Sequence, residues 1–128
     1  MAHTITRDRH GCLASYTGAV TFDEFLHVVQ TIHAHDNYDT LWHVIHDMSA
    51  VTALDLSKVN LSALMSHELG ARYTNPHIQS AVVSPDHGMH ALIVTLNNRT
   101  QLGIGLFLSV QEALGWIRPR QFNPPRYT

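Results

Sequence analysis

The residues best suited to chemistry lie in one short polar stretch, HDMSAVTALDLSK, which spans residues 46–58. The stretch holds two aspartates, two serines and the only lysine of the chain, and it directly follows the apolar run LWHVI. Short polar side chains at such a junction cap backbone turns, and a serine there can also accept a phosphate. The sequence therefore raises two alternatives for this stretch, a strand-to-helix turn and the site of a phosphorylation switch.

Eleven histidines raise the question of a metal site. Zinc sites need ligands that converge, commonly as HExxH or as pairs with short spacers. His43 and His46 are three residues apart in a predicted strand, so they face opposite sides of it. His87 and His90 could share the face of a helix, but the sequence offers no third ligand beside them. We therefore predict no metal site.

Common catalytic signatures are missing from the chain: no GxSxG elbow, no GxxxxGK[ST] phosphate loop and no GxGxxG after a strand. Asp36 and Asp39 form a carboxylate pair, but they lie in a turn-rich segment where polar residues are expected. The lone Cys12 lies in a strand-like run and reads as a packed thiol. His46 and Asp47 could act as an acid–base pair, yet no nucleophile accompanies them. We predict that the chain is not an enzyme and needs no cofactor.

The composition is that of one soluble globular domain. The chain has 128 residues, of which 45% are hydrophobic and 14% charged, and its formal net charge is -2. This charge does not indicate nucleic-acid binding, which usually needs a clustered basic surface. The basic residues cluster only in the tail, at Arg118, Arg120 and Arg126. No apolar run approaches the roughly 20 residues of a membrane span, and no signal-peptide core is present. With a single cysteine, the cytoplasm is the expected compartment.

The first third of the chain predicts a β-hairpin followed by a helix. Residues 3–8 and 12–18 are short, partly alternating runs separated by His10-Gly11. Thr21 and Glu24 then have the spacing of a capping box, which begins a helix. The apolar residues at helical spacing on one face are Phe22, Phe25, Leu26, Val29 and Ile32.

The rest of the chain alternates strands with helices. Strands are predicted at residues 41–46, 78–83 and 104–108. A helix begins near Asp55 and stops at Gly70, a second follows the strand at 78–83, and Ser109 with Glu112 caps a short final one. The order β-β-α-β-α-β-α-β-α predicts an α/β fold with a mostly parallel sheet and an antiparallel N-terminal edge. We expect one domain over residues 1–117 and an irregular tail over 118–128.

This topology gives the polar stretch a defined place. Asp47 is expected at the carboxyl end of a parallel strand, the edge of an open α/β sheet where ligands tend to bind. Asp55 is expected to cap the next helix, with Ser57 in its first turn. Unpaired N–H groups and the helix dipole favour an anion there, so a phosphate on Ser57 would be accommodated. Lys58 could pair with that anion or be an ordinary solvated residue.

The same stretch resembles the DLSGVxxxDSSG segment of STAS domains, the SpoIIAA-like anti-sigma-factor antagonists and their relatives. Aligned without gaps, the matching residues are Asp47, Ser49, Val51 and Asp55. Ser57 then occupies the position of the family's phosphorylated serine, whereas Leu56 and Lys58 replace a serine and a glycine of the motif. The element order and the ending FLSVQEALGWI also resemble the family, so the likeness covers residues 12–117 as a pattern.

The resemblance implies a stand-alone SpoIIAA-like (STAS) domain with about four helices and a non-enzymatic regulatory or protein-interaction role. The implied phosphorylation or partner-binding site comprises Asp47, Ser49, Asp55, Ser57 and Lys58. Its partner would be a protein such as a regulatory kinase or a sigma-factor regulator. The alternative, by analogy with related folds, is a small-molecule or lipid-binding module with a pocket between sheet and helices. A homodimer is the default expectation for oligomeric state.

Overall fold

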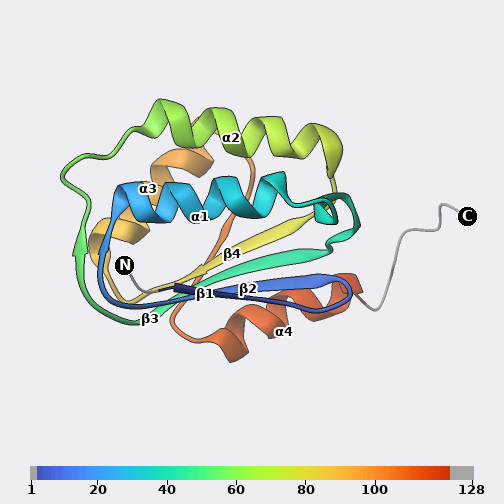
Figure 1. Cartoon of the computed structure of the whole chain (residues 1–128), viewed down its shortest axis with the longest axis horizontal. Helices are drawn as coiled ribbons and strands as arrows, with labels where there is room; N and C mark the ends of the chain where they lie inside the picture. Colours follow the sequence, from blue (N-terminus) through green and yellow to red (C-terminus); the bar gives the residue numbers. More distant parts are fainter. Residues whose placement is uncertain (1–2, 122–128) are drawn as a thin grey trace, which may run out of the picture.

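A computed structural model of the chain describes residues 3–121, with side chains as far as residue 117. Strands and helices alternate along it as the sequence predicts (Figure 1). Their bounds are β1 His3–Arg7, β2 Gly11–Thr21, α1 Phe22–Ala34, the short 3-10 helix η1 Tyr38–Thr40, β3 His43–Asp55, α2 Leu61–Thr74, β4 Gln79–Val83, α3 His87–Thr100, β5 Gly105–Phe107 and α4 Val110–Gln121.

The strands form one sheet in the order β1-β2-β3-β4-β5, with β1 antiparallel to β2 and every other pair parallel. This confirms the predicted α/β class, the N-terminal hairpin and the mixed sheet. Each crossover moves one strand in the same direction, so right-handed connections place α1, α2 and α3 on the same face. Figure 1 shows these helices above the sheet and α4 below it.

Apolar clusters lie on both faces of the sheet. The larger one lies beneath α1–α3 and buries the predicted face of α1, namely Phe22, Phe25, Val29 and Ile32, with Leu26 packed at its margin. The smaller one, against α4, comprises Ile45, Ala81, Val83, Ala113 and Ile117. Because side chains alternate along a strand, β3 supplies Val44 to the first cluster and Ile45 to the second.

The structure corrects the predicted boundary between β3 and the next helix. Asp55 does not cap a helix: it is the last residue of β3 and pairs with Thr21 of β2. The helix α2 begins only at Leu61, and Asn60 caps it by accepting a hydrogen bond from the Ala63 N–H at 3.0 Å. Ser57 therefore lies in a turn before the helix. The reason is the length of β2, which continues through Gly18 and so gives β3 a partner along its whole length.

Two further boundaries differ from the prediction. Gly70 does not end α2, which continues to Thr74 and is closed by the Asn75 N–H bonding to the Ala71 carbonyl. The Asn75 side chain donates to the carbonyls of Tyr38 and Leu41 and so ties the end of α2 to the loop before β3. α4 includes residues 118–121, which were predicted as irregular tail. Residues 122–128, with Arg126, lie outside the described residues.

Candidate functional site

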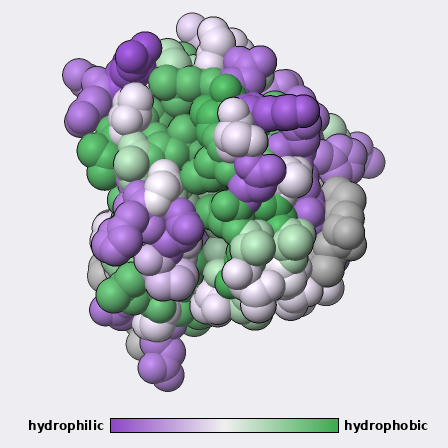
Figure 2. Space-filling view, turned by 90° about the vertical axis from the view of Figure 1, so that its left-hand side faces the viewer, coloured by the Kyte–Doolittle hydropathy of each residue, from purple (hydrophilic) through white to green (hydrophobic). Residues whose placement is uncertain are grey.

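The predicted site residues lie at the carboxyl edge of the parallel strands, where β3 runs past the end of β4. The pairing of β3 with β4 ends at Asp47 and Val83, while its pairing with β2 continues to Asp55. In Figure 1 the second half of β3 rises along the left of the molecule toward α2. Figure 2 views this side and shows apolar side chains gathered in the middle, bordered by hydrophilic ones. This edge is the part of an open α/β sheet at which ligands commonly bind.

Asp47 and Ser49 form a local turn in β3. The Asp47 Oδ1 accepts hydrogen bonds from the Ser49 N–H at 3.0 Å and from the Ser49 hydroxyl at 2.7 Å. The pairing with β2 shifts register at this point, from Ser15↔Asp47 to Thr17↔Ala50. Such a bulge bends a strand. Asp47 and Ser49 thus mark the point at which β3 leaves the plane that it shares with β4.

Asp55 and Ser57 form a second turn of the same kind at the end of β3. The Asp55 Oδ1 accepts a hydrogen bond from the Ser57 N–H at 2.9 Å. Hydrogen bonding from Ser57, and then the positive charge of Lys58, hold the pKa of the Asp55 carboxyl below its usual value. Asp55, Ser57 and Lys58 are all exposed. The structure thus brings these three residues together on an accessible turn.

Leu56 anchors this turn to the body of the protein. Its side chain is partly buried against the main core, while the residues on either side of it are exposed. A Cβ built on Gly88, in the first turn of α3, would lie 3.3 Å from Leu56 Cδ1. The turn Asp55–Lys58 is therefore fixed at its second residue and open to solvent at Ser57.

A groove opens beside the second half of β3. Its volume is about 250 Å³. It is lined by Met48, Val51, Thr52, Ala53 and Leu54 from β3 and by Ser84, Pro85 and Asp86 from the segment between β4 and α3. The groove lies at the edge of the sheet. The alternative hypothesis needs a pocket between sheet and helices, but that layer is packed with buried side chains such as Tyr16 and Phe25.

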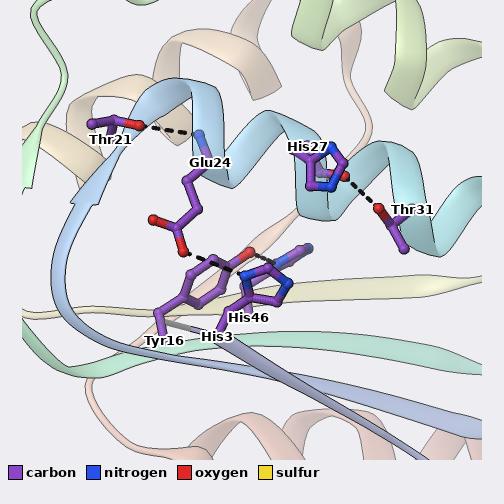
Figure 3. Close-up of polar contacts among 7 residues, drawn as sticks. All are labelled: His3, Tyr16, Thr21, Glu24, His27, Thr31 and His46. Atoms are coloured by element: carbon purple, nitrogen blue, oxygen red, sulfur yellow. Dashed lines mark hydrogen bonds and ion pairs between the residues drawn. The ribbon is translucent and has the colours of Figure 1, made fainter. Parts of the chain in front are cut away.

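The structure separates His46 from Asp47. The imidazole of His46 is buried under α1, and its Nδ1 lies 2.9 Å from the Tyr16 hydroxyl (Figure 3). Burial lowers the pKa of His46 to about 3 and raises that of Tyr16 far above its usual value. Asp47 instead bonds to Ser49. The His46-Asp47 pair weighed as a catalytic dyad is thus not assembled.

Figure 3 also shows that one half of the predicted capping box of α1 forms and the other does not. Thr21 Oγ1 accepts a hydrogen bond from the Glu24 N–H at 3.1 Å, as predicted. The Glu24 carboxylate does not reach back to Thr21. It lies 3.3 Å from Nδ1 of His3 in β1, which ties the edge strand to the helix.

A buried pair between α1 and α2 was missed by the sequence reading. His33 Nε2 lies 3.9 Å from Glu68 Oε2. Burial lowers the pKa of His33 to about 4 and raises that of Glu68 to about 7, so the imidazole is neutral at pH 7. The two residues are far apart in sequence and share no motif. Only the side-by-side packing of α1 and α2 brings them together.

Other chemistry has little support in the described part of the chain. Cys12 is buried, and burial raises the pKa of its thiol, which disfavours the reactive thiolate. Within residues 3–121, no three His, Cys, Asp or Glu side chains are grouped so that they could hold a metal ion. Among the described helices, none combines the length and apolarity needed to cross a bilayer.

Comparison with known proteins identifies the fold. No protein-family model matches this sequence, and no curated protein resembles it in sequence. Among solved structures, the unphosphorylated form of the anti-sigma factor antagonist SpoIIAA has a TM-score of 0.57 at 13% identity, covering 93% of this chain and 100% of its own. An anti-sigma factor antagonist from Mycobacterium paratuberculosis has a TM-score of 0.57 at 17% identity, over 91% and 93%. Phosphorylated Bacillus SpoIIAA has a TM-score of 0.56 at 14% identity, over 93% and 100%. The chain therefore has the SpoIIAA-like (STAS) fold that its motif and element order predict.

Proposed function

We propose that this chain is a non-enzymatic regulatory domain of the cytoplasm that binds a protein partner through the surface formed by Asp47, Ser49, Asp55, Ser57 and Lys58. The observation that carries the proposal is the turn Asp55–Lys58, which is held by the Asp55–Ser57 hydrogen bond and anchored by Leu56. A fixed turn with an exposed serine suits recognition, since little order must be gained on binding. The SpoIIAA-like fold adds support, because phosphorylated and unphosphorylated forms of SpoIIAA share it.

Phosphorylation of Ser57 would act on the turn itself. The serine does not lie at the N-terminus of α2, so the helix cannot stabilise a phosphate as the sequence suggested. A phosphate there would lie two residues from the Asp55 carboxylate, which repels it, and beside the Lys58 ammonium, which attracts it. Repulsion at the residue that holds the turn would loosen the turn. We expect the phosphorylated form to lose its partner.

The partner is sought by affinity capture from extracts of the native host, with the wild-type chain and a Ser57→Asp variant as bait. The Ser66→Asp variant is the matched control, because Ser66 is an exposed serine on α2. We expect a protein kinase or sigma-factor regulator on the wild type and the control, and loss of it on Ser57→Asp.

The intact mass of the protein from its native host tests the modification directly, because one phosphate adds about 80 Da. We expect a phosphorylated fraction that maps to Ser57. Unmodified protein together with identical partners on all three baits would remove the proposed role of Ser57.

A further inference from the structure

The second half of β3 carries a free strand edge. Within Ser49–Asp55, every residue except Ser49 and Thr52 pairs with β2 on one side, and on the other side β4 ends opposite Asp47. Among the described residues, no backbone hydrogen bond reaches the other side of this segment from a turn or loop. An exposed strand edge presents unpaired N–H and C=O groups, which are a template for another extended chain. The groove described above runs along this same edge.

Apolar side chains line one wall of that edge. Val51 and Leu54 are partly buried against the main core, and Met48 is fully buried beside them. Pro85, in the segment that leads to α3, also lines the groove. An added strand would therefore direct alternate side chains onto an apolar surface and the others toward solvent.

The rim of the groove is acidic. Asp86 lines it, and its Oδ1 accepts the hydrogen bond from the Met89 N–H that caps α3. Asp47 and Asp55 stand at the two ends of the strand segment that borders the groove, next in sequence to the lining residues Met48 and Leu54. Lys58, beyond the end of β3, is the nearest opposing charge in sequence. One carboxylate in the groove and two at the ends of the strand segment that borders it favour a partner that carries positive charge.

From these observations we infer that the free edge of Ser49–Asp55 binds an extended basic segment of a partner protein, which adds to the sheet as a strand beyond the end of β4. The bound segment alternates apolar residues, which lie on Val51 and Leu54, with lysine or arginine, which face Asp55 and Asp86. The inference names the chemistry of the partner and rests on the proposed partner-binding role of this edge. The backbone ladder supplies affinity, and the acidic rim supplies the preference for basic segments.

A model peptide tests this binding mode with the purified chain and needs no native partner. The probe is Lys-Val-Lys-Val-Lys-Val-Lys, blocked at both ends, and the control peptide has glutamate in place of each lysine. We expect the basic peptide to shift the backbone amide resonances of residues 49–55 and to slow their hydrogen exchange. The acidic peptide should leave these resonances in place.

Two variants separate the contributions of backbone hydrogen bonds and of charge to binding of the basic peptide. The first, Thr52→Pro, tests the backbone. Thr52→Pro removes an N–H at a position that the β2 ladder skips, since Val51 pairs with Gly18 and Ala53 with Ala19. Proline is tolerated at such bulges. We expect binding of the basic peptide to be lost while the circular dichroism spectrum and the thermal midpoint stay close to those of the wild type. Ala53→Ser serves as the structural control.

Charge reversal at Asp55 tests the rim. Asp55→Lys should lower the affinity for the basic peptide roughly two- to fivefold, the size expected for an exposed charge pair. Asp36→Lys, an exposed aspartate before η1 at the other end of the molecule, should leave binding unchanged.

The outcomes are decisive. Amide shifts confined to the Asp55–Lys58 turn or to α4, or none at millimolar peptide, would overturn the strand-addition mode. Broadening of residues 49–55 that grows with protein concentration in the absence of peptide would overturn it in favour of a second copy of this chain. Failure here leaves the pull-down with Ser57→Asp intact, because that experiment does not depend on strand addition.

Discussion

The two halves of β3 have different surroundings although they form one continuous strand. The first half lies between β2 and β4 and buries Val44, Ile45 and His46 in the body of the protein. The second half has β2 alone as a neighbour, and most of its residues are exposed. The first half therefore holds the fold together. The second half is supported by the fold and displays the groove and the turns. One strand can thus contribute to the core along one half and to the exposed surface along the other when its neighbours differ in length.

The largest effect expected from the contrast between the two halves of β3 is on the free energy of unfolding. Ile45→Ala should lower the free energy of unfolding by about 2–5 kcal/mol, because it leaves a cavity under α4. Val51→Ala, in the second half, should cost about 1 kcal/mol, since its side chain is only partly buried. Urea denaturation of the two variants measures the difference. Equal losses would mean that the second half belongs to the core as much as the first.

An acid-dependent loss of stability should also follow from the first half. Burial lowers the pKa of His46 from its ordinary value of 6.5 to about 3. Between these two pH values, the histidine is therefore protonated in the unfolded chain and neutral in the folded one. The stability contributed by His46 therefore falls as the pH drops below 6.5, by about 2 kcal/mol at pH 5. Thermal unfolding from pH 4 to pH 8 measures the loss. His33, whose pKa is lowered to about 4, acts in the same direction. Glu68, whose pKa is raised to about 7, acts in the opposite direction, because the folded chain binds a proton there that the unfolded chain does not.

Substitution isolates the part due to His46. His46→Gln keeps a partner for the Tyr16 hydroxyl and removes the titrating group, so its stability should depend less steeply on pH. His27→Gln, at an exposed histidine of α1, should keep the wild-type dependence. An unchanged slope in His46→Gln would show that this histidine is protonated within the folded protein.

The smallest expected effect is on hydrogen exchange at the end of the second half of β3. Asp55→Ala removes the acceptor of the Ser57 N–H, so the Ser57 amide should exchange with solvent severalfold faster, the scale of one net hydrogen bond. The same loosening is expected in the wild type as the pH falls through the lowered pKa of Asp55, because the carboxylate that accepts the bond is then protonated. Asp36→Ala is the control, and hydrogen exchange by NMR is the measurement. A protected Ser57 amide in Asp55→Ala would mean that Leu56 alone fixes the turn.

The elements that could be predicted from the sequence are those with local signals. The Thr21 cap, the apolar face of α1 and the Ser109 cap, which accepts from the Glu112 N–H at 3.1 Å, all follow from short spacings. The SpoIIAA-like fold followed from the order of such elements together with one motif. These features depend on neighbours within a few residues, and the structure retains them.

The end of β3 could not be predicted because the deciding residue lies in another strand. An aspartate that accepts a hydrogen bond from the N–H two residues on occurs both at helix caps and in isolated turns, so Asp55 alone fits both. Gly18, which was read as the end of β2, adopts a positive φ of 71° beside a register shift and lets β2 continue to Thr21. That continuation makes Asp55 a strand residue. The long-range pair of His33 and Glu68 was missed for a similar reason, since only helix packing joins them.

The contact of Leu56 with the first turn of α3 gives the exposed turn a mechanical connection to the interior. A Cβ at position 88 would lie only 3.3 Å from Leu56 Cδ1, so the glycine leaves room for the Leu56 side chain beside the start of α3. A side chain at position 88 would therefore press on Leu56 and shift the exposed turn that Leu56 anchors.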